Sequence, residues 1–359
     1  MSLNNKPLFQ GKQIALFSDL HIGVHRDSPV WHDIALKFAD WFVDVLNERG
    51  IKDIVFCGDY FHTRHEIVQT SLQCGVEFLS KLKNFNLHMI PGNHCCYFKN
   101  NATVHSLQPF KEWSNVTVYN DITTLTCNDK TFTFCPWGNE ENLFDKCDVL
   151  FGHFEIVNFK MNTFKVCEHG TSSEDLLRKG NKVITGHFHL RDHRIYDNSK
   201  EVLYLGSPYQ MDYGERGQDK GVTLLNTDTL EFEFIKNQQS PLHIKVKLSD
   251  LLEKNEDAKR ALSCISGNFI CIVIDVDIER EKLDLIISRL NNFIPAEIRI
   301  DYNTFQEYIS KEVEQVEVVG IDIYNSIQKF VEIMSTNTDK QSIVNTVNEI
   351  YQIALNNNE

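Results

Sequence analysis

Short apolar runs alternate with longer helical segments between residues 13 and 92, and this alternation limits the folds open to the chain. The runs 14–17, 54–57 and 87–90 have the length and composition of buried strands. Between them, 31–50 and 66–84 carry apolar residues at the spacing of amphipathic helices. Strands that alternate with helices form βαβ units, so this region predicts a mostly parallel sheet covered by helices.

The sequence after residue 115 is richer in strands. One further helix is predicted near 173–179. This second pattern favours an α/β fold in which two sheets pack as a sandwich, rather than a simple doubly wound sheet. The later strands are expected at 116–119, 131–134, 149–151, 183–185, 202–205 and 222–225.

A chain of 359 residues is long for one hydrophobic core, so more than one domain is expected. The polar run 237–241 predicts a boundary, followed by a compact αβαβ unit. That unit is predicted from a helix at 248–262, a strand at 269–276, a helix at 279–290 and a strand at 297–302. The predicted division is an α/β sandwich domain over 1–240, a small α/β cap domain over 241–305, and a linker with two C-terminal helices over 306–359.

The charge and the apolar pattern exclude several classes of protein. The net charge is −14, which is the wrong sign for a protein that holds nucleic acid by general basicity. No apolar run approaches the ~20 residues that span a bilayer, and residues 1–13 lack a secretory stretch, so we expect a cytoplasmic protein without a membrane partner. The ten cysteines include no CxxC pair and are interpreted as reduced thiols.

Five short polar pieces each follow a predicted strand. Because the carboxyl ends of parallel strands share one crevice, side chains from distant pieces can converge there. Alternation along an extended segment predicts that Asp19 and His21 point the same way, as do His187 and His189. Glycines before four of the polar residues are expected to allow sharp turns. The pieces are DLH at 19–21, GDYFH at 58–62, GNH at 92–94, GH at 152–153 and GHFH at 186–189.

Carboxylate, amide and imidazole groups without thiolates suit Mn²⁺, iron or Mg²⁺ better than structural zinc. Two such cations ~3.5–4 Å apart need a bridging oxygen ligand. Asp59 is the candidate bridge, because it is the middle carboxylate of the series. The sequence therefore predicts a site for two divalent cations, with Mn²⁺ as the first choice.

The ordered set D-x-H, GD, GNH, GH and GHxH resembles the calcineurin-like metallophosphoesterase superfamily over about residues 13–235. Within it, the stretches SDLHIG, CPWGNEEN, GHFE and LGSP resemble the SbcD-type recombination nucleases, including those of T-even-type bacteriophages. For a phage protein, the expected location is the cytoplasm of the host cell.

The resemblance implies a role for each matching residue. His94 would protonate the departing alkoxide or steady the transition state, and His62 would contact the phosphodiester. The family usually has an acidic residue after GNH, whereas Cys95 stands here, so this chain is expected either to orient His94 or its loop by another group or to turn over more slowly. The implied ligands are Asp19, His21 and His189 for one metal, Asn93, His153 and His187 for the other, and Asp59 as the bridge.

The expected function is a metal-dependent DNA exonuclease or endonuclease of an SbcCD-like recombination and double-strand-break repair complex. A metal-bound hydroxide would attack phosphorus in line. The resemblance implies a homodimer and a partner, an SbcC-like ABC-type ATPase with a coiled coil, which residues 320–359 would bind. The alternatives are a protein phosphatase, a small-molecule phosphodiesterase and a non-catalytic subunit that binds DNA ends. Protein phosphatases of this superfamily usually have Asp-Arg-Gly after GD, and this chain does not.

Overall fold

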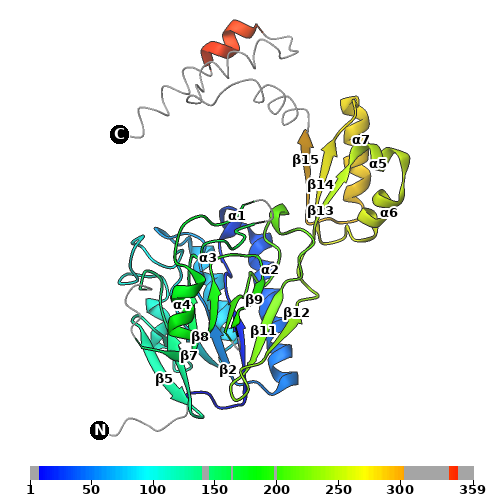
Figure 1. The fold of residues 1–359 in the computed structure, drawn as a ribbon. Coiled ribbons are helices and arrows are strands. Elements are labelled where there is room, and N and C mark those ends of the chain that lie inside the picture. Colours follow the sequence, from blue (N-terminus) through cyan, green and yellow to red (C-terminus); the bar gives the residue numbers. More distant parts are fainter. Residues whose placement is uncertain (1–7, 140–144, 163–164, 198–199, 303–338, 347–359) are drawn as a thin grey trace. The chain divides into compact units, whose positions relative to one another are not determined.

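The protein is described here from a computed structural model that covers residues 8–139, 145–162, 165–197, 200–302 and 339–346. Two six-stranded sheets form its main body (Figure 1). In the first sheet the order is β12-β11-β1-β2-β3-β4, with β1 to β4 parallel and β11 and β12 antiparallel at one side. Its strands are β1 Gln13–Phe17, β2 Asp53–Phe56, β3 Asn86–Met89, β4 Val116–Val118, β11 Gly221–Asn226 and β12 Phe232–Lys236.

The second sheet also has four neighbouring parallel strands, but its other two strands are placed differently. Its order is β5-β6-β7-β8-β10-β9, with four parallel strands in the middle and an antiparallel strand at each edge. The sequence did not predict β5, β9 or β12. The strands are β5 Thr123–Cys127, β6 Lys130–Phe134, β7 Cys147–His153, β8 Gly180–Gly186, β9 Asp192–Ile195 and β10 Glu201–Tyr204.

Alternation along β1 explains why the sheets form layers. Ile14 and Leu16 belong to the apolar core between the two sheets, together with Phe134 and Phe151 of the second sheet. Residues of opposite parity, such as Phe17, pack against the helices on the other face. The predicted two-sheet α/β sandwich is confirmed. The helices of this body are α1 Val24–Asp27, α2 Pro29–Arg49, α3 Gln69–Lys81 and α4 Ser173–Lys179, with the 3-10 helices η1 Gln108–Glu112 and η4 Tyr213–Glu215.

The region after residue 241 contains a three-stranded sheet in the order β13-β14-β15, with its own apolar core. The predicted helix, strand, helix and strand occur in that order, but the prediction missed β13, which precedes the first helix. The single helix predicted at 248–262 is divided at Lys254, whose φ is 54°, and Asn255 caps the second part. The predicted domain limits at 240 and 305 remain predictions. The elements are β13 His243–Lys247, α5 Leu248–Glu253, α6 Glu256–Ser263, β14 Phe269–Ile274, α7 Arg280–Asn291 and β15 Glu297–Tyr302.

The predicted C-terminal helices fall largely outside the described residues. The first, over 323–334, lies entirely outside them, and residues 340–346 of the second are helical. Among the helices that the structure describes, none combines the length and apolarity needed to cross a membrane.

A histidine lies in the core between the sheets. His88 of β3 is 7% exposed and packs against Phe9, Tyr119 and Phe134. Its Nδ1 lies 2.8 Å from the Tyr119 hydroxyl, and its Nε2 has no hydrogen-bond partner among the described residues. Burial lowers the pKa of His88 to about 4. The neutral imidazole is therefore the form that the folded chain accommodates.

We expect His88 to make the fold sensitive to acid. Its folded pKa lies below the ordinary value, so its stabilising contribution is complete above about pH 6.5 and is lost as the pH falls toward 4. Urea unfolding at pH 7 and pH 4.5 tests this with His88→Gln, which cannot titrate there. The free energy of unfolding should fall by about 2 kcal/mol more in the wild type than in the variant. Equal losses would contradict this account.

Candidate metal centre

The polar residues predicted as a site are brought together at the carboxyl ends of parallel strands from both sheets. Asp19 and His21 follow β1, and Asp59 follows β2. Asn93 and His94 follow β3, while His153 ends β7 and His187 and His189 follow β8. Because both sheets direct these strand ends to one edge, residues far apart in sequence become neighbours.

Asp19, His21 and His189 form the first cluster of ligand atoms. One such atom from each residue lies within 4.8 Å of the others. The Nε2 atoms of His21 and His189 are 3.0 Å apart, and Asp19 Oδ1 is 4.0 Å from His21 Nε2. His189 Nδ1 faces a carboxylate of Glu215 at 2.8 Å, so it carries the proton and leaves the Nε2 lone pair free to bind.

Asp59, His153 and His187 form the second cluster, which Asn93 joins. Asn93 Oδ1 lies 2.9 Å from both His153 Nε2 and His187 Nδ1. His153 Nδ1 lies 2.7 Å from the carbonyl oxygen of Cys57, which can only accept, so this nitrogen bears the proton. Nε2 is therefore the ring nitrogen of His153 that faces the cluster.

The amide of Asn93 can be oriented in two ways. With the oxygen toward the histidines, the oxygens of Asn93 and Asp59 converge with one ring nitrogen each of His153 and His187, an arrangement that a cation stabilises. The opposite orientation directs NH₂ to these acceptors and the oxygen to Arg64 Nη2 at 2.9 Å. A bound cation selects the first orientation, because an amide binds metal through its oxygen.

Asp59 contacts both clusters. Its Oδ2 is 3.2 Å from His153 Nε2 and 3.6 Å from His21 Nε2. Burial alone would raise the pKa of Asp59, but the neighbouring imidazoles outweigh it and hold the pKa well below its usual range. The carboxylate is therefore ionised, and its position suits a ligand shared between two cations.

The pKa values of the two imidazoles in the second cluster shift in opposite directions. Burial disfavours the charged form of His153, but contact with Asp59 raises its pKa to about 9. Burial and then the charge of His153 lower the pKa of His187 to about 3. A cation in the second cluster would replace the proton on His153, since metal ligands must be deprotonated. The mixture of carboxylate, amide and imidazole atoms fits two divalent cations.

His94 and His62 lie beside the first cluster. The backbone N–H of His94 donates to Asp59 Oδ1 at 2.7 Å, and its Nδ1 lies 2.5 Å from the carbonyl oxygen of His62. The rings of His94 and His62 stack, with 5.4 Å between centroids. His62 Nδ1 is 3.4 Å from His21 Nδ1. Both histidines predicted to act on substrate therefore border the predicted ligands.

Cys95 does not replace the acidic residue that the family usually has after GNH. Its thiol is buried and accepts a hydrogen bond from the backbone N–H of Tyr60 at 3.3 Å. Burial raises the pKa of Cys95 to about 11, so the thiol stays neutral. The carbonyl oxygen of His62 orients His94 instead.

The backbone at the site is not extended, contrary to the expectation from alternation. Asp19 and His21 have φ values of 54° and 48°, and Asp59 and His187 have 62° and 93°. Side chains other than glycine rarely adopt this left-handed region, and such residues concentrate at functional sites. The side chains converge because the strand-end loops turn sharply at the functional residues themselves.

Two charged side chains that contact the site were not predicted from the sequence. Arg64 is half-buried beside Asn93, and Glu215 of η4 contacts His189. Neither belongs to a short motif, and Glu215 is 26 residues from His189 in sequence. Only the folded structure reveals these contacts.

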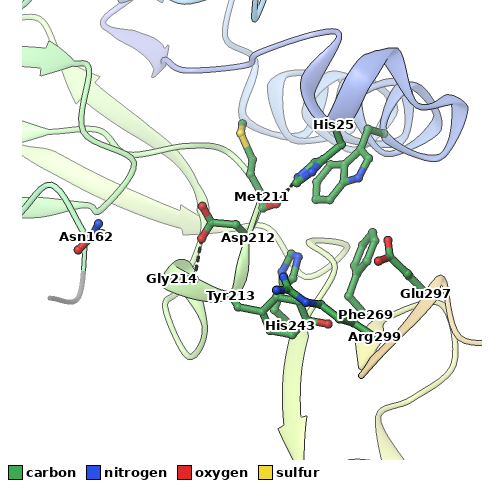
Figure 2. Close-up of a pocket in the computed structure, with 11 residues that line it drawn as sticks. His25, Asn162, Met211, Asp212, Tyr213, Gly214, His243, Phe269, Glu297 and Arg299 are labelled. Atoms are coloured by element: carbon green, nitrogen blue, oxygen red, sulfur yellow. Dashed lines mark hydrogen bonds between the residues drawn. The ribbon is translucent and has the colours of Figure 1, made fainter. Parts of the chain in front are cut away.

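A separate cavity of about 370 Å³ lies next to the segment that carries Glu215 (Figure 2). Its walls include stacked rings of Trp31, His243 and Phe269, together with the backbone segment from Met211 to Gly214. These three rings are each less than 5% exposed. They pack as core, and the cavity contains none of the clustered ligand atoms.

The two-sheet fold and the paired carboxylate and histidine clusters define a metallophosphoesterase. Residues 12–215 match the calcineurin-like phosphoesterase family, and the chain belongs to that family. Enzymes of this family use divalent metals.

Two curated relatives extend the comparison. The chain is 23% identical to exonuclease subunit 1 of Enterobacteria phage T4, over 94% of this chain and 98% of that protein. It is 26% identical to a protein of Invertebrate iridescent virus 3 named as a phosphoesterase, over 64% of this chain and 71% of that one. Among solved structures, a dimetal phosphatase from Danio rerio is similar at 10% identity and a TM-score of 0.37, covering 62% of this chain and 93% of its own.

Gly92 allows the β3 loop to approach Asp59. A Cβ atom at this position would lie 2.3 Å from Asp59 Oδ1 and 2.6 Å from the Asp59 backbone nitrogen. The φ of Gly92 is not among the positive values, so the predicted sharp turn is not its role. Absence of a side chain, rather than backbone freedom, explains this glycine.

We therefore expect Gly92→Ala to displace Asp59 and weaken Mn²⁺ binding by about tenfold or more. Gly11→Ala is the matched control, because a Cβ there would meet nothing closer than 3.7 Å. Isothermal titration with Mn²⁺ measures both. Undiminished affinity in a folded Gly92→Ala protein would show that the close approach to Asp59 is unimportant for binding.

Proposed function

We propose that this protein is a two-metal-dependent DNA nuclease, acting as an exonuclease or endonuclease in recombination and double-strand-break repair. The observation that carries the proposal is Asp59, a buried ionised carboxylate within 3.6 Å of imidazoles from both clusters. The similarity to a phage exonuclease subunit over 94% of the chain supports DNA as the substrate. The proposed cations are Mn²⁺, with Mg²⁺ or iron as alternatives, and the proposed location is the cytoplasm.

The ligand assignment follows the two clusters. Asp19, His21 and His189 would hold one cation, Asn93, His153 and His187 the other, and Asp59 both. Bound divalent cations would supply positive charge for the phosphate and an activated water. A phosphodiester is anionic, and the chain carries a net charge of −14, so this local positive charge is needed to hold substrate.

His94 is the proposed proton donor to the leaving alkoxide. Its Nδ1 is occupied by the carbonyl oxygen of His62, so Nε2 is the atom that would deliver the proton. The bond from its backbone N–H to Asp59 fixes the distance between this acid and the ligand cluster. His62, stacked on His94, is placed to contact the phosphodiester from the same side.

Asp59→Asn and His187→Ala should each reduce Mn²⁺-dependent cleavage of linear duplex DNA by about a hundredfold or more, because each removes a proposed ligand. His169→Ala changes an exposed histidine outside both clusters and should retain activity. End-labelled DNA measures cleavage, and circular dichroism checks the fold. Full activity in either folded site variant would contradict the ligand assignment.

Substrate choice separates the rival functions. Faster turnover of a phosphopeptide or a cyclic nucleotide than of DNA would identify another phosphoesterase on this scaffold. Two bound Mn²⁺ ions and DNA-end binding without turnover would identify a non-catalytic subunit.

We further propose that residues 320–359 bind an SbcC-like ABC-type ATPase with a coiled coil, and that the chain forms a homodimer. The relative's name, exonuclease subunit 1, supports a multi-subunit nuclease. The apolar residues at 3–4 spacing in this segment suit helices that pack on a partner.

Deleting residues 320–359 should abolish co-purification with the ATPase while preserving Mn²⁺-dependent hydrolysis of bis(p-nitrophenyl) phosphate. The catalytic clusters lie between residues 19 and 189, so the deletion leaves them intact. Light scattering of the same preparations reports whether the chain is dimeric. Loss of both properties, or of neither, would count against the proposed role of this segment.

A further inference from the structure

Glu215 is a buried carboxylate that contacts a proposed metal ligand from behind. Its side chain is 4% exposed, and its Oε1 lies 2.8 Å from His189 Nδ1. It ends the short helix η4, which Asp212 caps by accepting a hydrogen bond from Gly214 N at 2.6 Å (Figure 2). The local backbone thus fixes the position of the carboxylate.

The other carboxylate oxygen belongs to a buried network. Glu215 Oε2 is 2.6 Å from Lys220 Nζ and 2.9 Å from Ser207 Oγ. The side chain of Lys220 is 1% exposed. A buried carboxylate and a buried ammonium are costly unless paired and hydrogen-bonded, so each requires the other. Burial opposes ionisation of Glu215, but Lys220 lowers its pKa to about 2.

The same network holds His189 at two points. Glu215 accepts from the ring, and Lys220 Nζ donates to the backbone carbonyl oxygen of His189 at 2.6 Å. Ring and backbone of one residue are therefore fixed by the two members of one ion pair. If the ring of His189 rotated, Glu215 would stay buried without its hydrogen bond from Nδ1, which is unfavourable.

We propose that Glu215, supported by Lys220, is the positioning residue that fixes the ring orientation and tautomer of His189 and thereby sets the affinity of the first cation site. The inference rests on the ligand role of His189 in the proposed function. Carboxylates that orient metal-binding imidazoles in this way typically change metal affinity by about 10- to 100-fold when removed.

A second group of the same composition provides a matched control. Glu201 accepts from His193 Nε2 at 2.8 Å and pairs with Lys182. This trio lies on strands of the second sheet, and His193 belongs to none of the clusters of ligand atoms found in the described part of the chain. Glu201→Gln removes a charge from the same kind of network without touching a proposed ligand.

The test compares Mn²⁺ binding to the wild type, Glu215→Gln and Glu201→Gln by titration calorimetry, with electron paramagnetic resonance to count bound ions. Glu215→Gln should weaken one of two sites by about 10- to 100-fold and leave the other unchanged. Glu201→Gln should leave both unchanged. A general loss of folding would weaken both sites together, so the difference between sites distinguishes positioning from stability.

Glu215→Gln leaves Lys220 buried without its counter-charge and can therefore destabilise the fold. The double variant Glu215→Gln/Lys220→Met removes both charges and should show the same loss at one site. Equal Mn²⁺ affinities in the wild type and a folded Glu215 variant would overturn this inference but leave the proposed function intact. Failure of the wild type to bind Mn²⁺ would overturn the proposed function together with it.

Discussion

Asp59 is the contact through which the two halves of the site meet. Its Oδ2 lies near His21 from the first sheet and His153 from the second, and its Oδ1 accepts from the backbone of His94. A buried carboxylate needs such compensation, because an unpaired charge in the interior is strongly unfavourable. The packing of the two sheets therefore brings together groups that neither sheet could supply alone. Imidazoles provide the compensation here, and divalent cations would provide it more completely.

The charge of the chain shows why compensation must be local. With a net charge of −14, the protein as a whole repels a phosphodiester. The repulsion is overcome only where positive charge is concentrated, and the paired clusters offer a cation several converging ligands. Salt would screen the long-range repulsion but have less effect on buried contacts at the site.

The sequence predicted the sandwich and the convergence of the polar pieces, because both depend on local patterns. Alternation along β1 divides Ile14 from Phe17 between two layers, and each polar piece directly follows a strand. The left-handed backbone of Asp19 was not predictable, since it arises from the tertiary fit of the loop. β13 was not predicted because its sequence, HIKVK, is half polar and lies beside a polar boundary. Glu215 was not predicted because its partner, His189, is 26 residues away in sequence.

Three imidazoles at the site are oriented by different means. Carbonyl oxygens of Cys57 and His62 hold His153 and His94, whereas a carboxylate holds His189. A backbone carbonyl is part of the main chain, carries no net charge and needs no buried counter-charge. A buried carboxylate needs its own counter-charge, which Lys220 supplies while also holding the His189 backbone. The charge on Glu215 would make His189 a more basic ligand than an imidazole held by a carbonyl oxygen. The stability of the Glu215–Lys220 ion pair and the affinity of the proposed first cation site would therefore be coupled.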